Sequence, residues 1–132
     1  MIKAIRERQR QRQKAIELVR EYAKRLQKTI GPVTVILYGS FARGDFNLGS
    51  DIDVMIIGDS LPARPLARLD LLYSCLDHGQ IEPKGYTKSE FRKMLEHNHP
   101  WVTAALAQGV VVADHGFLGQ LGYTGITIKS RE

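Results

Sequence analysis

Residues 39–53 read GSFARGDFNLGSDID and carry two features that mark out a site. A Gly39-Ser40 pair follows an apolar run, and further along Asp51 and Asp53 are separated by a single residue. Alternate side chains of an extended strand point to one face, so the two carboxylates would lie close together. Like charges this close are costly unless a cation lies between them, and Mg²⁺ is the hard cation that binds one or two carboxylates together with phosphate oxygens. The aspartate pair therefore predicts a metal site.

The Gly39-Ser40 turn predicts a phosphate site beside the metal. A glycine lets the backbone approach an anion closely, and free N–H groups where a helix starts attract phosphate. Ser40 can hydrogen-bond a phosphate through its hydroxyl or its N–H, and it can also cap the following helix. Arg43, one turn further on, can neutralise phosphate charge or pair with Asp45. Asp45 itself is expected to shape the loop.

This spacing resembles the signature of the DNA polymerase beta-like nucleotidyltransferase superfamily, and the run ARGD at 42–45 resembles its minimal nucleotidyltransferase branch. The order of expected elements matches that family from about residue 33 to residue 114. The resemblance implies an α/β (α+β) nucleotidyltransferase fold, in which helices pack on a small mixed sheet. It also implies transfer of a nucleoside monophosphate, with ATP expected as the donor of AMP, to a hydroxyl of an acceptor while pyrophosphate leaves.

The resemblance further implies two Mg²⁺ ions and a third carboxylate on a neighbouring strand. Glu82 is the candidate, as a ligand of the second ion or as acceptor of the proton from the attacking hydroxyl. Pro83 follows it and removes one N–H, which indicates an edge or bulged strand. A solvated surface glutamate is the alternative. The candidate catalytic and metal-binding residues are Asp51, Asp53 and Glu82, and the candidate nucleotide-binding residues are Gly39, Ser40 and Arg43.

The same resemblance implies a partner. Minimal members commonly pair with a small helical HEPN protein in toxin–antitoxin couples, and in such a pair the transferase can adenylylate its partner. A HEPN-like protein is therefore the expected acceptor. The alternative is a non-catalytic, antitoxin-like subunit that binds a nucleotide or a partner.

The net charge of +5 is unevenly distributed along the 132 residues. Residues 1–28 hold ten Lys or Arg and three Glu, whereas the remainder holds nine basic and eleven acidic residues. The basic segment 1–28, called the N-terminal arm below, raises a third hypothesis, nucleic-acid binding. No aromatic residues interleave the arginines, so stacking on bases is not indicated. A solvated helix end or a contact with an acidic partner is favoured.

Length and composition predict one domain over residues 1–132, with a basic N-terminal helix over 1–29 and a loosely held tail over 123–132. The single cysteine, Cys75, excludes a disulfide within the chain. With no apolar signal sequence or membrane span, a cytoplasmic location is expected. The four histidines are interpreted as loop residues and not as a metal set.

Apolar residues recur at helical spacing over about 14–29, which predicts an amphipathic helix that Gly31-Pro32 ends. The remaining pattern predicts four strands over 33–38, 51–57, 80–86 and 110–113. A short helix is expected near 41–43 and a longer one over 65–77, with Leu66, Leu69, Tyr73 and Leu76 facing the core. A capping-box pattern at Thr87 opens another helix. A last short helix ends before Gly109, and its Trp101 is expected in the core, with a platform on which a base stacks as the alternative.

Overall fold

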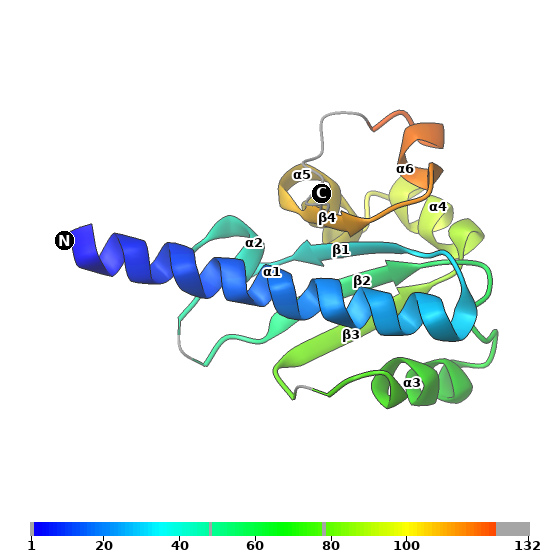
Figure 1. Ribbon diagram of the computed structural model, residues 1–132. Helices are drawn as coiled ribbons and strands as arrows, with labels where there is room; N and C mark the ends of the chain where they lie inside the picture. The colour runs from blue at the N-terminus through cyan, green and yellow to red at the C-terminus, as the bar shows by residue number, and fades with distance from the viewer. Residues whose placement is uncertain (1, 48, 78, 124–132) are drawn as a thin grey trace.

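The chain folds as a mixed α/β structure around a four-stranded sheet (Figure 1). The computed structural model describes residues 2–47, 49–77 and 79–123. In chain order the elements are α1 (Ile2–Ile30), β1 (Thr34–Tyr38), α2 (Ser40–Arg43), β2 (Ile52–Ile57), α3 (Pro65–Ser74), β3 (Ile81–Tyr86), α4 (Lys88–Glu96), α5 (Pro100–Gln108), β4 (Val110–Ala113) and α6 (Phe117–Gln120). The mixed sheet and its packed helices confirm the predicted fold class.

The strand order in the sheet is β3-β2-β1-β4. β1 pairs antiparallel with both β2 and β4, and β2 pairs parallel with β3. β3 is therefore an edge strand, which is where Pro83 is tolerated because its missing N–H leaves no ladder partner unsatisfied. The end of β1 and the starts of β2 and β3 lie together along one edge of the sheet. This is the edge at which strands begin and end, and not the lateral edge formed by β3.

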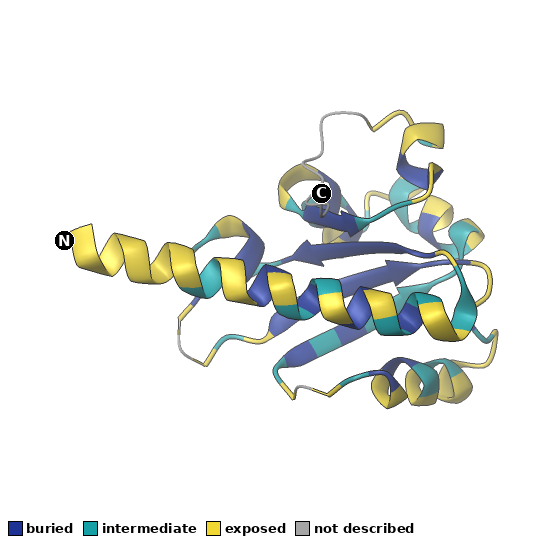
Figure 2. Ribbon diagram, in the orientation of Figure 1, coloured by how far each residue is buried: buried dark blue, intermediate teal, exposed yellow. Residues whose placement is uncertain are grey.

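The sheet separates two apolar cores, and its strands are the most buried part of the molecule (Figure 2). Alternate residues of each strand point to opposite faces. On one face, Val54 and Ile56 pack against the buried stripe of α1 and against Leu72 of α3. On the other face, Met55 and Ile57 pack with residues of α4, α5 and α6.

α1 is one continuous helix, and its N-terminal part extends past the sheet (Figure 1). Its buried residues begin at Ala15 and recur at helical spacing to Leu26, which is the amphipathic stripe expected from the sequence. The Arg/Gln-rich segment ahead of it is helical too. Gly31, whose φ is 86°, ends the helix before Pro32 as predicted.

The predicted core face of α3 is wrong. Leu66, Leu69 and Tyr73 are 77%, 45% and 49% exposed, whereas Leu72 is buried. The rotation of the helix is set in part by Arg68, whose guanidinium pairs with Glu90 at 2.7 Å and also donates to the carbonyl of Gly85 at 3.1 Å.

Leu72 and Cys75 follow Arg68 at helical spacing and so face inward, while the alternative apolar stripe faces away from the sheet. Both stripes fit a helix, and polar contacts favour the stripe with Leu72: Arg68 pairs with Glu90, and the Tyr22 hydroxyl donates to the carbonyl of Leu72 at 2.7 Å. No helix within the described ranges combines the length and apolarity needed to cross a membrane.

The capping box at Thr87 is confirmed. The Thr87 hydroxyl accepts from the N–H of Glu90, and the Glu90 carboxylate accepts from the N–H of Thr87. The tail predicted for 123–132 lies, beyond residue 123, outside the described residues.

Candidate active site

Strand register brings the predicted site residues to one edge of the sheet. Tyr38, the last residue of β1, pairs with Asp53 of β2. On its other side Asp53 pairs with Glu82 of β3. Residues paired directly across neighbouring strands point to the same face, so the two carboxylates are neighbours. Gly39 follows Tyr38 and turns the chain into α2 at this same edge.

Gly39 has a backbone conformation that favours glycine, with φ 78° and ψ −155°. The space around it is also restricted. A Cβ built on Gly39 would overlap the Asp53 carboxylate oxygen and lie 3.2 Å from its Cγ. The glycine therefore does two things: it makes the turn, and it leaves room for the Asp53 side chain against the backbone of the turn.

Asp53 is half-buried, and burial raises its pKa above the ordinary value. The negative charge of Glu82 raises the pKa of Asp53 further, as does that of Asp51, while Lys84 and Arg43 act in the opposite direction. Tyr38 beside it has a raised pKa, first because of burial and then because of the Asp53 charge. Negative charge thus accumulates at this edge of the sheet, where a cation would relieve it.

Asp51 is exposed and lies immediately before β2. Within the described residues, no three His, Cys, Asp or Glu side chains already converge as a metal site. The structure thus brings Asp53 and Glu82 together and leaves Asp51 at the open end. The donor set itself, a group of carboxylate oxygens, is of the kind that Mg²⁺ binds. The metal-binding roles stay a prediction.

Ser40 is the first residue of α2, and the N-cap position belongs to Gly39, which makes no side-chain cap bond. The capping role considered for Ser40 is therefore not the one it has. Arg43 closes the same short helix and pairs with Asp45, its Nε lying 3.1 Å from Oδ2. Arg43 nevertheless remains close enough to Asp53 to lower its pKa.

A cavity of about 450 Å³ lies at this edge of the sheet. Its lining includes the predicted residues Gly39, Ser40, Arg43 and Asp53, together with Tyr38, Lys84, Trp101 and Ala104. Predicting Trp101 in the core is wrong, since this side chain is 48% exposed. The buried stripe of α5 is formed by Val102, Ala105 and Leu106, and residue 101 lies about 100° away from Val102 on a helix of 3.6 residues per turn. That offset is the signal in the sequence that could have placed Trp101 outside the core.

The family model described as "Nucleotidyltransferase domain" matches residues 16–104, about two thirds of the chain. The chain belongs to the nucleotidyltransferase domain family. Two relatives come from Methanocaldococcus jannaschii, and each is named as a candidate protein adenylyltransferase.

One of these relatives is 39% identical over 49 residues, which cover 36% of this chain and 50% of the relative. The other is 60% identical over 25 residues, which cover 19% of this chain and 25% of the relative. The matched segments thus span half or less of each relative's length. No solved structure gives a significant match to the chain.

In this nucleotidyltransferase domain the N-terminal arm contacts α2 and the loop that follows α2. Arg12 donates from Nε to the carbonyl of Phe41 at 3.0 Å and from Nη2 to the carbonyl of Ala42 at 2.9 Å. Arg8 donates to the carbonyl of Phe46 and lies over its ring, 4.9 Å from the centroid. The prediction of a solvated helix end is therefore wrong for these two arginines. They bind α2 and the loop that follows it, here together called the active-site loop.

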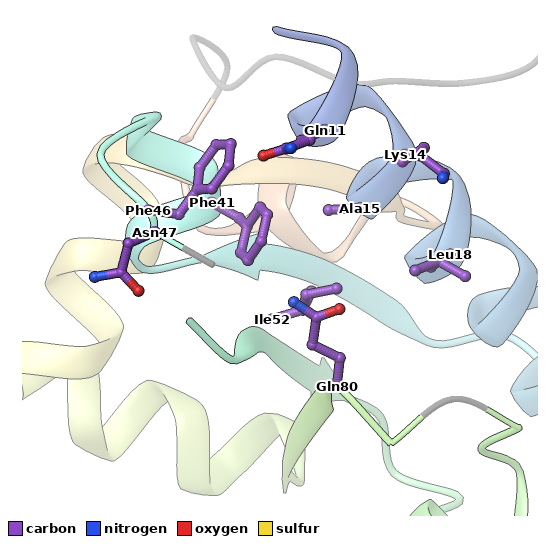
Figure 3. A pocket seen from close by; sticks show the side chains of 9 residues that line it. All are labelled: Gln11, Lys14, Ala15, Leu18, Phe41, Phe46, Asn47, Ile52 and Gln80. Atoms are coloured by element: carbon purple, nitrogen blue, oxygen red, sulfur yellow. The ribbon is translucent and has the colours of Figure 1, made fainter. Parts of the chain in front are cut away.

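A second cavity, of about 260 Å³, lies between α1 and that loop (Figure 3). Gln11 and Lys14 reach it from α1, while the stacked rings of Phe41 and Phe46, 4.1 Å apart, form its opposite wall. Ile52 also lines it, and this side chain points to the sheet face opposite Asp53. The candidate active site and this cavity therefore lie on opposite faces of the sheet.

Proposed function

We propose that this chain is a Mg²⁺-dependent nucleotidyltransferase that moves AMP from ATP to a hydroxyl of an acceptor. The observation that carries the proposal is the strand register that sets Asp53 beside Glu82, at the sheet edge where Gly39 turns the chain. Membership of the nucleotidyltransferase domain family supports the class of reaction. The names of the two relatives support adenylyl transfer.

The residues of the pocket match what the transfer requires. Nucleotidyl transfer depends on positioning and charge neutralisation more than on covalent chemistry with the protein. Ser40, Arg43 and Lys84 offer a hydroxyl and two cations to the triphosphate from the pocket wall. The new bond joins the acceptor oxygen to the α-phosphorus, the bond from that phosphorus to the pyrophosphate oxygen breaks, and the hydroxyl proton passes to Glu82.

Asp51, Asp53 and Glu82 are the residues that would hold Mg²⁺. When bound, the ion supplies charge neutralisation for the triphosphate and for the leaving pyrophosphate. Burial first, and then the negative charge of Glu82, make ionised Asp53 costly and raise its pKa, and a bound cation would offset this cost. The Gly39 backbone keeps the Asp53 carboxylate against the turn, so that the metal-binding and phosphate-binding groups stay adjacent.

We propose a protein as acceptor, with a HEPN-like partner as the first candidate. Two observations support a macromolecular acceptor. The two relatives carry names that specify a protein acceptor. The exposed part of the N-terminal arm also offers several arginines and the exposed side chains of Ile2 and Ile5 to a partner with an acidic, partly apolar surface.

The test is label transfer from α-labelled ATP to a candidate HEPN-like protein, together with calorimetry of ATP binding with and without Mg²⁺. We expect Mg²⁺-dependent binding and transfer in the wild-type chain, loss of transfer in Asp53→Asn, and unchanged transfer in the matched control Asp70→Asn on α3. Binding without transfer to any acceptor would favour the non-catalytic subunit. Equal ATP affinity with and without Mg²⁺, in wild type and Asp53→Asn alike, would refute the metal-dependent site.

A further inference from the structure

We propose that Trp101 is the platform on which the base of the bound nucleotide stacks. The inference rests on the proposed function, because it assigns the base end of the same nucleotide. The lining of the cavity comes from two chemically different groups of residues. Gly39, Ser40 and Asp53 are the group to which the proposed function assigns phosphate and metal, here called the phosphate end, whereas Trp101 and Ala104 of α5 are an aromatic and apolar group, here called the aromatic end. A nucleoside triphosphate has the same two-part character.

The indole of Trp101 is not needed to anchor α5. Val102 and Ala105, on the buried side of the helix, are fully buried, so the packing of α5 holds without Trp101 and leaves its side chain at the pocket. The helix begins at Pro100, and His99 caps it by accepting a hydrogen bond from the N–H of Trp101 at 3.2 Å. The cap fixes the backbone of Trp101 beside the pocket, with the His99 ring 5.2 Å from the indole ring, and about half of the Trp101 side chain stays exposed.

One π-face of the indole is turned toward the pocket and carries a lysine. The Nζ atom of Lys84 lies 4.6 Å from the ring centroid, and Lys84 lines the same cavity. The cation is attracted to the face of the ring, so a base that stacks on this face would take the place of the Lys84 ammonium there. Lys84 also lies near enough to Asp53 to lower its pKa, which links the aromatic end of the pocket to the phosphate end.

The ligand class follows from this chemistry. Every nucleobase has a π-face, and stacking on an aromatic side chain tolerates differences between bases. Trp101 should therefore favour a nucleotide over a bare polyphosphate, and it should contribute little to the choice between ATP and GTP. Trp101 is a binding residue for the base, whereas the carboxylates are assigned to Mg²⁺.

The chain carries a built-in probe of this contact, because Trp101 is its single tryptophan. Titration of the intact protein with ATP and Mg²⁺ should quench or shift the tryptophan emission. Inorganic tripolyphosphate with Mg²⁺ should bind at the phosphate end and leave the emission nearly unchanged. The same titrations followed by calorimetry report binding independently of the fluorescence.

Substitutions test the energetics. Trp101→Ala should weaken ATP binding about 5- to 150-fold, the range that corresponds to the loss of one stacked base, and should leave the affinity for tripolyphosphate unchanged. Trp101→Phe, which retains an aromatic ring, should recover most of the ATP affinity. Tyr73→Ala removes an exposed aromatic side chain from α3 and is the matched control, with no expected effect on either ligand.

The two proposals fail in different ways. If calorimetry shows Mg²⁺-dependent ATP binding while the emission stays constant and Trp101→Ala binds ATP as tightly as wild type, the stacking platform is overturned and the proposed function stands. Equal losses of affinity for ATP and for tripolyphosphate in Trp101→Ala would also overturn it, because the ring would then be supporting the pocket as a whole. If no nucleotide binds the wild-type chain, both proposals are overturned.

Discussion

Gly39 and Asp53 approach so closely that position 39 has no room for a side chain. The glycine lies at the end of β1 in a conformation with positive φ, and the Asp53 carboxylate occupies the space that a Cβ would need. The turn and the acidic side chain are therefore one unit. A substitution at either residue therefore alters the space available to the other, although fourteen positions separate them in the sequence.

Gly39→Ala should damage both the fold and the site. The backbone conformation costs a residue with a Cβ about 1–3 kcal/mol, and the overlap forces the Asp53 side chain away from the turn. We expect a lower free energy of unfolding in urea, together with loss of nucleotide transfer. Gly116→Ala is the control, because Gly116 also has a positive φ but has no atom within 4 Å of the added Cβ. That variant should lose about 1–2 kcal/mol and keep transfer. Normal transfer by Gly39→Ala would contradict the contact with Asp53.

Asp53→Asn should stabilise the metal-free protein at neutral pH. Burial, followed by the charge of Glu82, raises the pKa of Asp53 above its ordinary value of 3.8, so the folded state binds this proton more tightly than the unfolded chain does. The cost of ionised Asp53 is fully present above the raised pKa and disappears as the pH falls toward 3.8. Thermal unfolding across this range should show a higher Tm for Asp53→Asn at neutral pH and a gap that closes in acid.

Asp70→Asn, on the exposed side of α3, should follow the wild-type melting curve at every pH. Added Mg²⁺ should raise the Tm of wild type and have little effect on Asp53→Asn, because only the wild type retains the buried carboxylate. A Tm gap between wild type and Asp53→Asn that is constant across the pH range would show that the effect is not electrostatic.

Glu82→Gln should reduce transfer while much of the nucleotide affinity remains. Loss of a group that accepts the hydroxyl proton costs about 10²–10⁴-fold in rate, whereas Asp51 and Asp53 are still present to bind. The same substitution removes a negative charge beside Asp53, so the pKa of Asp53, followed by NMR titration of its carboxyl carbon, should fall. Glu96→Gln, exposed at the end of α4, is the control. Activity within a few-fold of wild type would make Glu82 a surface residue.

Arg12→Ala should lower both stability and nucleotide affinity. Its guanidinium donates to the carbonyls of Phe41 and Ala42, and hydrogen bonds of a charged group contribute about 1.5–3 kcal/mol. The loss should displace α2, which carries Ser40, and so raise the KM for ATP. Arg10→Ala removes an exposed ion pair with Glu7 on the same helix and should cost less than about 1 kcal/mol. Indistinguishable unfolding curves for the two variants would show that the arm does not hold the loop.

The sequence by itself determined the local features of this protein. Period-two and helical patterns located the strands and most helices, Gly31 marked the end of α1, and Thr87 with Glu90 marked the start of α4. These features depend on neighbours within a few residues, so a single stretch of chain contains the information. The spacing between Gly39-Ser40 and the aspartates was likewise enough to indicate the family, because the turn and the strand are close together in the sequence.

Only the tertiary structure decided what depends on contacts between distant segments. Which of two apolar stripes of α3 is buried follows from polar contacts such as the pairing of Arg68 with Glu90. That the N-terminal arm holds the active-site loop follows from the contacts of Arg12 with residues 41 and 42, about thirty positions away. The exposure of Trp101 at the pocket follows from the packing of α5 on β1. In each case the pattern along the chain allowed more than one arrangement, and the satisfaction of a buried or half-buried polar group, or the filling of a core, selected one.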